Sequence, residues 1–166
     1  MVSLLSIFIG AIYETVIVGL RAVNAADERE DVRGQLFSAL DRLTRETRMA
    51  RNVDHATDQQ FQFDMDTDGD GASTGAEQNV DYEVIGGVLT RAANGGSAVT
   101  IVRSLTSLDF NYLKNGSVTE YSTCDATSSC SSQCCRTDVR AVLITASATR
   151  DQETISMTSA AFLDNM

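Results

Sequence analysis

Proline is absent from this chain of 166 residues, and histidine and lysine each occur once, as His55 and Lys114. Without proline, no segment can be a proline-rich linker. A single histidine is more often a surface or structural residue than a metal ligand or a catalytic base. The sequence also contains no HExxH, GxSxG or phosphate-loop motif. We therefore expect that the chain is not an enzyme.

Basic residues are few as well, because 13 Lys and Arg stand against 23 Asp and Glu, for a formal net charge of -10. Such a chain repels polyanions instead of collecting phosphate contacts, so we expect no nucleic-acid binding. The length predicts one modest globular domain with enough apolar residues for a core, in addition to an unusual first segment.

That first segment, residues 1–20 (MVSLLSIFIGAIYETVIVGL), contains no basic residue and a single acid. It is as long as the ~20 apolar residues that a bilayer-spanning helix needs. A cleaved secretory signal would need a charged first region, and the apolar run instead passes without a break into polar helix-forming sequence. We predict a transmembrane half-helix whose apolar surface serves lipid or neighbouring helices. Its candidate contact residues are Ile9, Gly10, Tyr13, Glu14 and Ile17.

Two features of the charged residues near this helix need an explanation: the acid Glu14 within it and the absence of basic residues before it. Glu14 is a functional candidate because acids are rare in membrane helices, but we prefer a side chain that snorkels to the interface near Arg21. Every Lys and Arg lies after Leu20, so the positive-inside rule does not explain an orientation for a protein that starts at Met1. We expect a basic segment to precede this sequence.

A second helical pattern covers residues 21–52 and continues the first. On its exposed faces, Asp41 with Arg45 and Arg42 with Glu46 are spaced i,i+4; such pairs are worth roughly 0.2–0.5 kcal/mol each and should mainly solubilise. We expect the helix to stop between residues 52 and 58. Side chains at three- and four-residue spacings form its apolar stripe: Val32, Leu36, Leu40, Leu43, Thr47 and Ala50.

From residue 59 the period changes to two, as Phe61, Phe63 and Met65 alternate with polar residues. Gly86-Gly87 and Asn115-Gly116 are typical hairpin turns. We predict an α+β fold in which an antiparallel sheet within residues 59–163 leans on the helix. The expected strands are 60–65, 79–85, 88–93, 97–103, 107–113, 117–122, 137–149 and 152–163.

Four cysteines, Cys124, Cys130, Cys134 and Cys135, lie within twelve residues, without a CxxCH signature or accompanying histidines. A zinc site is disfavoured, because the adjacent last two cysteines fit tetrahedral geometry badly. We expect two disulfides in an oxidising compartment. Of three possible pairings we disfavour the vicinal one, and the other two remain open.

An acidic loop, residues 66–77 (DTDGDGASTGAE), matches the calcium-loop pattern D-x-[DN]-x-[DN]-G-x5-E at every defined position. The flanks are strand-like, unlike the helices of an EF-hand, and the alternative is a solvated acidic hairpin loop. As an unpaired loop it should bind calcium with a dissociation constant on the order of 0.1–1 mM. The expected ligands are Asp66, Asp68, Asp70, Ala72 (backbone carbonyl), Thr74 and Glu77.

The first 53 residues, including ALDRLTRETRMA, resemble the start of the PilW and GspJ group of minor pilins and pseudopilins, where an apolar helix runs into a segment of the form ALDRLTRELRMA. The likeness continues in GGVLTRAANGGSAVTIVRSLTSLDFNYL and in DVRAVLITASATRDQETISMTSAAFL, which is similar to the family's closing hairpin. Members carry a basic leader, a cleavage-site glycine and a glutamate within FTLxELM. This chain begins at the final methionine of that motif, so we expect an upstream start. Glu14 lies about two helical turns too far along to replace that glutamate.

The resemblance implies a pilin-like fold with a protruding apolar half-helix, and a minor pilin of a type IV pilus, at the tip or priming assembly. It places the chain in the inner membrane as a single-pass protein, then in an extracellular or periplasmic filament, with other pilins or pseudopilins as partners. A type II secretion pseudopilin is the alternative. A membrane-anchored calcium-binding surface module is the alternative of another class.

Overall fold

The computed structural model describes residues 2–68, 77–114, 119–124, 134–150 and 153–163; the side chains of 2–9 and 11 are not among the described parts. The chain forms two compact units, residues 1–34 and 35–166. One N-terminal helix, α1 (Val2–Arg48), belongs to both and packs through its last part on antiparallel sheets, so the fold is α+β as predicted. The strands are β1 (Ala50–Ala56), β2 (Gln60–Met65), β3 (Val80–Ile85), β4 (Val88–Ala92), β5 (Val99–Val102), β6 (Ser107–Lys114), β7 (Glu120–Tyr121), β8 (Val139–Arg150) and β9 (Glu153–Phe162), with a short 3-10 helix, η2 (Arg136–Asp138), before β8.

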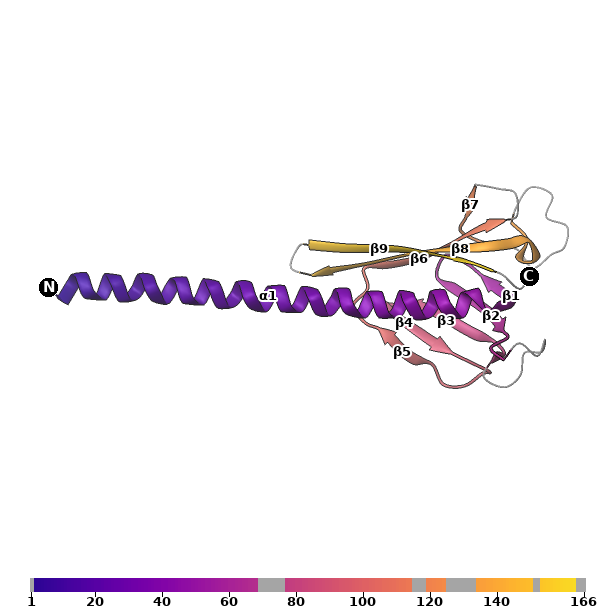
Figure 1. Ribbon diagram of the computed structural model, residues 1–166, viewed down its shortest axis with the longest axis horizontal. Coiled ribbons are helices and arrows are strands. Elements are labelled where there is room, and N and C mark those ends of the chain that lie inside the picture. The colour runs from indigo at the N-terminus through magenta and orange to yellow at the C-terminus, as the bar shows by residue number, and fades with distance from the viewer. Residues whose placement is uncertain (1, 69–76, 115–118, 125–133, 151–152, 164–166) are drawn as a thin grey trace. The chain divides into compact units, whose positions relative to one another are not determined.

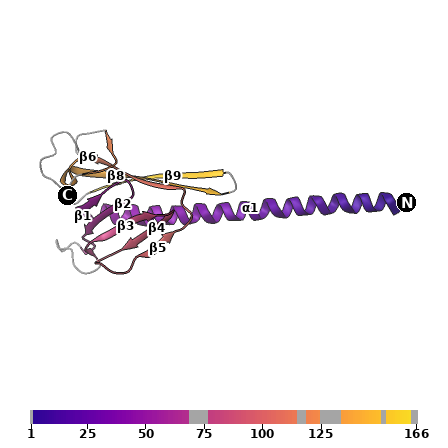
Figure 2. The same ribbon diagram turned by 180° about the vertical axis from the view of Figure 1, so that it is seen from behind.

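The strands form two sheets, where the sequence led us to expect one. The first has the order β1-β2-β3-β4-β5 and the second the order β7-β6-β8-β9. The break falls between β5 and β6, because β6 pairs along its length with β8, from Ser107 opposite Ser147 to Lys114 opposite Val139. The last turns of α1 run between the two sheets (Figure 1), as the reverse view also shows (Figure 2).

Most of the predicted apolar stripe of the helix is buried in this arrangement, although Val32 is half-buried and Ala50 belongs to β1. Leu36, Leu40 and Leu43 are almost inaccessible to solvent, as is Thr47. Aromatic rings of the two sheets also meet, with the ring centroids of Phe61 in β2 and Phe110 in β6 lying 5.9 Å apart, and both residues are fully buried. Burial of a large apolar side chain is worth about 1.5–3 kcal/mol, so this shared core holds the two sheets and the last turns of α1 together.

One charged residue of α1 faces the first sheet. Glu46 accepts hydrogen bonds from Arg42 (3.0 Å), from the Tyr82 hydroxyl (2.9 Å) and from Arg91 (2.7 Å). Burial, together with the neighbouring Glu46 carboxylate, raises the pKa of Tyr82, so its phenol stays protonated and donates. The pair of Arg42 with Glu46 is therefore more than the solubilising surface pair that its spacing suggested. The pair of Asp41 with Arg45 (2.6 Å) is exposed, as expected.

Our prediction of a helix to residue 52 was wrong, because α1 ends at Arg48 and β1 begins at Ala50. Met49 N–H donates to the Glu46 carbonyl at 3.1 Å, which closes the last turn. We did not predict β1, because its pairing with β2 shifts register twice, between Ala50 and Asn52 and between Val53 and His55. Those irregularities break the period of two by which a strand is recognised.

The other predicted strands within the described residues agree with the structure to within a few residues, except that β7 is reduced to Glu120–Tyr121. The Gly86-Gly87 hairpin turn is confirmed, with φ of 57° and 76°, both in the left-handed region. A Cβ at Gly87 would lie 2.6 Å from the Leu105 carbonyl oxygen, so the turn needs glycine there. The Asn115-Gly116 turn lies outside the described residues.

Candidate functional site

The first unit presents large apolar side chains to solvent. The predicted contact residues Gly10, Tyr13 and Glu14 are exposed and Ile17 is half-buried, while the side chain of Ile9 lies outside the described residues. Contiguous exposed apolar surface of this kind marks an interaction site. The exposed set comprises Ile12 (50%), Tyr13 (66%), Val16 (53%), Val18 (64%), Leu20 (59%) and Val23 (57%).

Within the residues that the structure describes, no helix is both long and apolar enough to cross a membrane.

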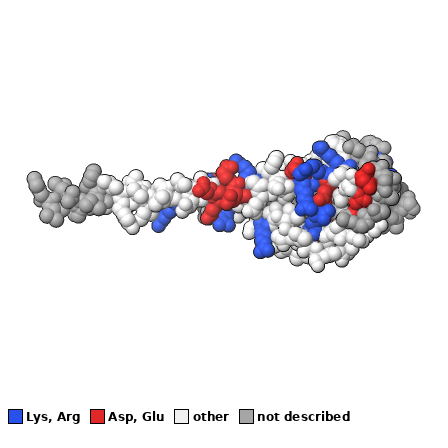
Figure 3. All heavy atoms as spheres, turned by 60° about the horizontal axis from the view of Figure 1, so that its bottom comes forward, with Lys and Arg blue, Asp and Glu red and all other residues white. Residues whose placement is uncertain are grey.

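Charged residues follow the apolar run along α1, and Figure 3 shows acidic atoms grouped on the helix with basic atoms beside them. On a helical projection, Asp27 and Asp31 lie within about 40° of each other and on the same face as Leu20 and Val23. Arg29 projects from the opposite side of the helix. This acidic helix face therefore joins two apolar side chains to two carboxylates.

A groove lies between the last turns of α1 and the edge strand β9, with a volume of about 410 Å³. Its apolar lining includes Phe37, which is 66% exposed. Thr44 and Ser159 join the two walls by a 2.8 Å hydrogen bond between their hydroxyls. The groove is lined by Phe37, Leu40, Asp41, Thr44, Arg45, Arg48, Met157, Thr158 and Ser159.

No pattern in the sequence marks this groove. Phe37 stands one position away from Leu36, so its place in the sequence puts it off the buried stripe of the helix but does not mark a binding surface. Met157 and Ser159 come from a strand more than a hundred residues later, and no local pattern places them beside Phe37.

The ends of the predicted calcium loop lie close together. Glu77 is 8% exposed and accepts hydrogen bonds from the Thr67 N–H (2.9 Å) and the Thr67 hydroxyl. Asp66 forms an ion pair with Arg51 at 3.2 Å. Asp70, Ala72 and Thr74 lie outside the described residues. The described residues include no group of three or more His, Cys, Asp or Glu placed to hold a metal ion.

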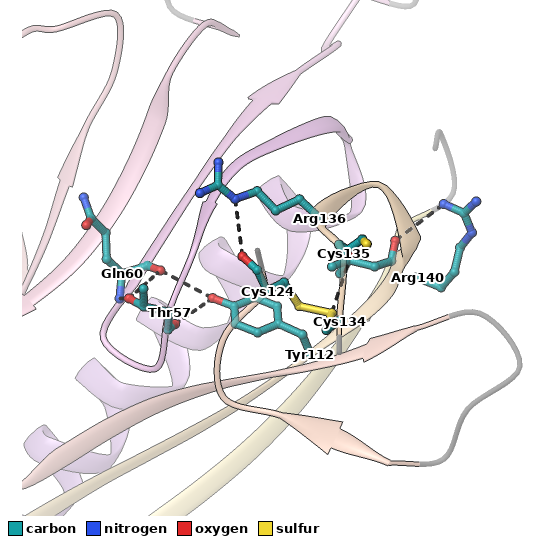
Figure 4. The surroundings of a disulfide bond; sticks show 9 residues. Thr57, Gln60, Tyr112, Cys124, Cys134, Cys135, Arg136 and Arg140 are labelled. Atoms are coloured by element: carbon teal, nitrogen blue, oxygen red, sulfur yellow. Dashed lines mark hydrogen bonds between the residues drawn. A yellow bond between two sulfur atoms is a disulfide. The ribbon is translucent and has the colours of Figure 1, made fainter. Parts of the chain in front are cut away.

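A disulfide joins Cys124 to Cys134, with 4.6 Å between their Cα atoms (Figure 4). This bond excludes the vicinal pairing that we disfavoured and decides between the two pairings left open. Cys135 is also disulfide-bonded, and Cys130 lies outside the described residues. The predicted use of these cysteines in disulfides is thus confirmed for Cys124, Cys134 and Cys135.

The disulfide fixes a segment against the outer edge of β1. The Cys124 N–H donates to the Ala56 carbonyl at 3.1 Å, and the Arg136 guanidinium donates to the carbonyls of Cys124 (3.4 Å) and of Asp54. Beside it, the buried Tyr112 hydroxyl donates to the Thr57 carbonyl at 2.7 Å (Figure 4). Carbonyls at this edge of the first sheet therefore have partners, which protects the edge from pairing with other chains.

No protein-family model matches this chain, and no curated protein matches it either.

Proposed function

We propose that this chain is a structural subunit of a type IV pilus, a minor pilin at the tip or priming assembly. The observation that carries the proposal is the contrast along α1, where most of the described apolar side chains in residues 12–23 are exposed and those of Leu36, Leu40 and Leu43 are buried. A helix with both kinds of surface fits a subunit that packs one part on its own sheets and offers the other part to lipid or neighbouring subunits. Packing alone carries this function, so it needs no nucleophile, base or metal.

The disulfide supports a location outside the cytoplasm. Disulfides persist in oxidising compartments such as the periplasm and the cell surface. A subunit held in the inner membrane before assembly, and in an extracellular or periplasmic filament afterwards, would carry the Cys124–Cys134 bond in such a compartment. The resemblance of residues 1–53 to the PilW and GspJ group points to the same class of partners, namely other pilins or pseudopilins.

The proposal is tested by placing a charge on the exposed helix. Ile17→Arg puts a cation in the apolar half, at a cost of about 2.5–3.5 kcal/mol in a bilayer centre, and should abolish incorporation into fibres. The matched control is Phe162→Arg, which makes the same kind of change at a side chain that is 62% exposed on β9. Fibres sheared from cells that express each variant are probed for the chain. Normal amounts of the Ile17→Arg variant in fibres would overturn the proposal.

A type II secretion pseudopilin would use the same surfaces, and the choice between the two systems depends on the partner. Deletion of this chain should reduce surface fibres if it is a pilin, and should reduce the export of secreted proteins if it is a pseudopilin.

We also propose that the loop from Asp66 to Glu77 takes calcium. The complete sequence pattern supports this, as does the contact of Thr67 with Glu77, which brings the ends of the loop together. In a membrane-anchored calcium-binding surface module, the loop alone would carry the function and the chain would remain monomeric in membranes.

A further inference from the structure

The groove between α1 and β9 has an exposed apolar lining, which is unusual for a surface that faces only water. Phe37 is 66% exposed at its wall, Leu40 and Met157 add apolar lining, and the arginines Arg45 and Arg48 lie at one end. Arg45 pairs with Asp41 at 2.6 Å, which leaves a net positive charge on this lining. A fitting occupant therefore presents apolar side chains followed by carboxylates.

The acidic helix face of the same chain has this chemistry in the same order. Leu20 and Val23 are exposed and precede Asp27 and Asp31 on one side of α1. The spacing agrees as well, because Leu20 precedes Phe37 by 17 residues and Asp31 precedes Arg48 by 17 residues. Two parallel helices displaced by that number of residues would pair both at once.

We propose that the groove binds the acidic helix face of a second copy of this chain, with the two helices parallel and staggered by about 26 Å. Leu20 and Val23 of one copy cover Phe37 of the other, and Asp27 and Asp31 face Arg45 and Arg48. An antiparallel arrangement that keeps Asp27 opposite Arg45 would bring Asp31 against Asp41, and like charges repel. The order of apolar and charged side chains thus fits a second copy in the parallel direction. The inference rests on the proposed function, since it describes how neighbouring subunits of a filament meet.

Photo-cross-linking tests this contact directly. The full-length chain, carrying a benzophenone amino acid in place of Phe37, is purified in detergent as an equal mixture of normal and heavy-isotope copies. Irradiation should join position 37 of one copy to a peptide of the other copy that contains Leu20 or Val23. Products within one copy, products at other segments, and adducts with detergent alone would each overturn the inference.

A charge exchange tests the pairing of the arginine with the acid. Arg48→Asp and Asp31→Arg should each lower the yield of the cross-linked dimer by about three- to tenfold, which is the effect of one or two exposed charge pairs. The double variant that carries both changes should recover the yield, because the new aspartate then faces the new arginine. Arg103→Asp, a change at an exposed arginine outside the groove, is the control and should leave the yield unchanged. Failure of the double variant to recover would contradict the pairing.

The two proposals fail in different ways. A chain that is found in fibres but cross-links elsewhere disproves the groove contact and leaves the filament subunit standing. A chain that is absent from fibres disproves the filament subunit, while the cross-linked dimer in detergent still decides whether the groove binds a second copy.

Discussion

The two parts of helix α1 use similar residues for opposite purposes. Before residue 24, side chains such as Val16 and Val18 are more than half exposed, whereas Leu36 and Leu43 in the last turns are 1% and 0% exposed. Both parts are helical, so helix formation does not distinguish them. The last turns pack on the sheets of residues 35–166, whereas residues 12–23 present apolar side chains to solvent, which teaches that burial depends on tertiary packing and not on the helix itself.

The largest expected effect comes from removing one apolar side chain from each part. Leu43→Ala should lower the free energy of unfolding by about 2–5 kcal/mol, because it leaves a cavity in the core. Val18→Ala, at an exposed position of the same helix, should change it by no more than about 0.5 kcal/mol. Denaturant unfolding followed by circular dichroism measures both. Equal losses for the two variants would remove the contrast between the parts.

The second prediction concerns the disulfide, which belongs to the packed part alone. Replacing both Cys124 and Cys134 by serine should destabilise residues 35–166 by up to about 3 kcal/mol, the value for a loop of this length. Hydrogen exchange should show faster opening at β1 and β6 and unchanged exchange in residues 12–30. Faster exchange in the exposed part of α1 as well would contradict this division of the molecule.

A smaller loss of stability should distinguish two ion pairs of α1, Arg42 with Glu46 and Glu30 with Arg33. Glu46→Gln weakens three hydrogen bonds to a charged group and should cost about 2 kcal/mol of unfolding free energy. Glu30→Gln alters an exposed pair with Arg33 at 3.5 Å and should cost less than about 0.5 kcal/mol. Thermal melting of the two variants beside the wild type tests the difference. A Glu46→Gln variant as stable as the wild type would show that this half-buried carboxylate does not hold α1 on the first sheet.

The smallest expected effect is that of calcium on the packed part. At ten times its dissociation constant, the ion should add about 1.4 kcal/mol to stability. Asp66→Ala and Glu77→Gln should each abolish the shift in melting temperature between millimolar calcium and chelator. Asp138→Ala, at an exposed acid outside the loop, should retain it. The loop would be only acidic if the wild type melted at the same temperature in both solutions.

Local patterns predicted the elements of this fold well. The spacing of Leu36, Leu40 and Leu43 identified the buried helix face, and the alternation of Phe61 and Phe63 identified β2, because burial on one face imposes the period of its element. β1 was missed because its register shifts hide that period. The division into two sheets was missed because it depends on the pairing of Ser107 with Ser147, forty residues apart.

In the candidate sites too, local spacing predicted some features, and others depend on residues far apart in the sequence. Cysteine spacing predicted disulfides, but only the fold shows which partner Cys124 has, since three pairings satisfy the same sequence. Glu46 was read as half of an exposed pair because Arg42 is four residues away, whereas Tyr82 and Arg91 reach it from 36 and 45 residues along the chain. The groove at Phe37 has no sequence pattern, because its two walls come from opposite ends of the chain.

The central claim is that the exposed part of α1 serves assembly into a filament, and the presence of this chain in purified fibres tests it most directly. Fibres are sheared from cells, freed of membranes and analysed by mass spectrometry and by immunogold labelling against residues 35–166. We expect peptides of this chain in the fibre fraction and gold particles on the fibres or at their tips. Recovery of the chain from the membrane fraction alone, with unlabelled fibres, would contradict the account.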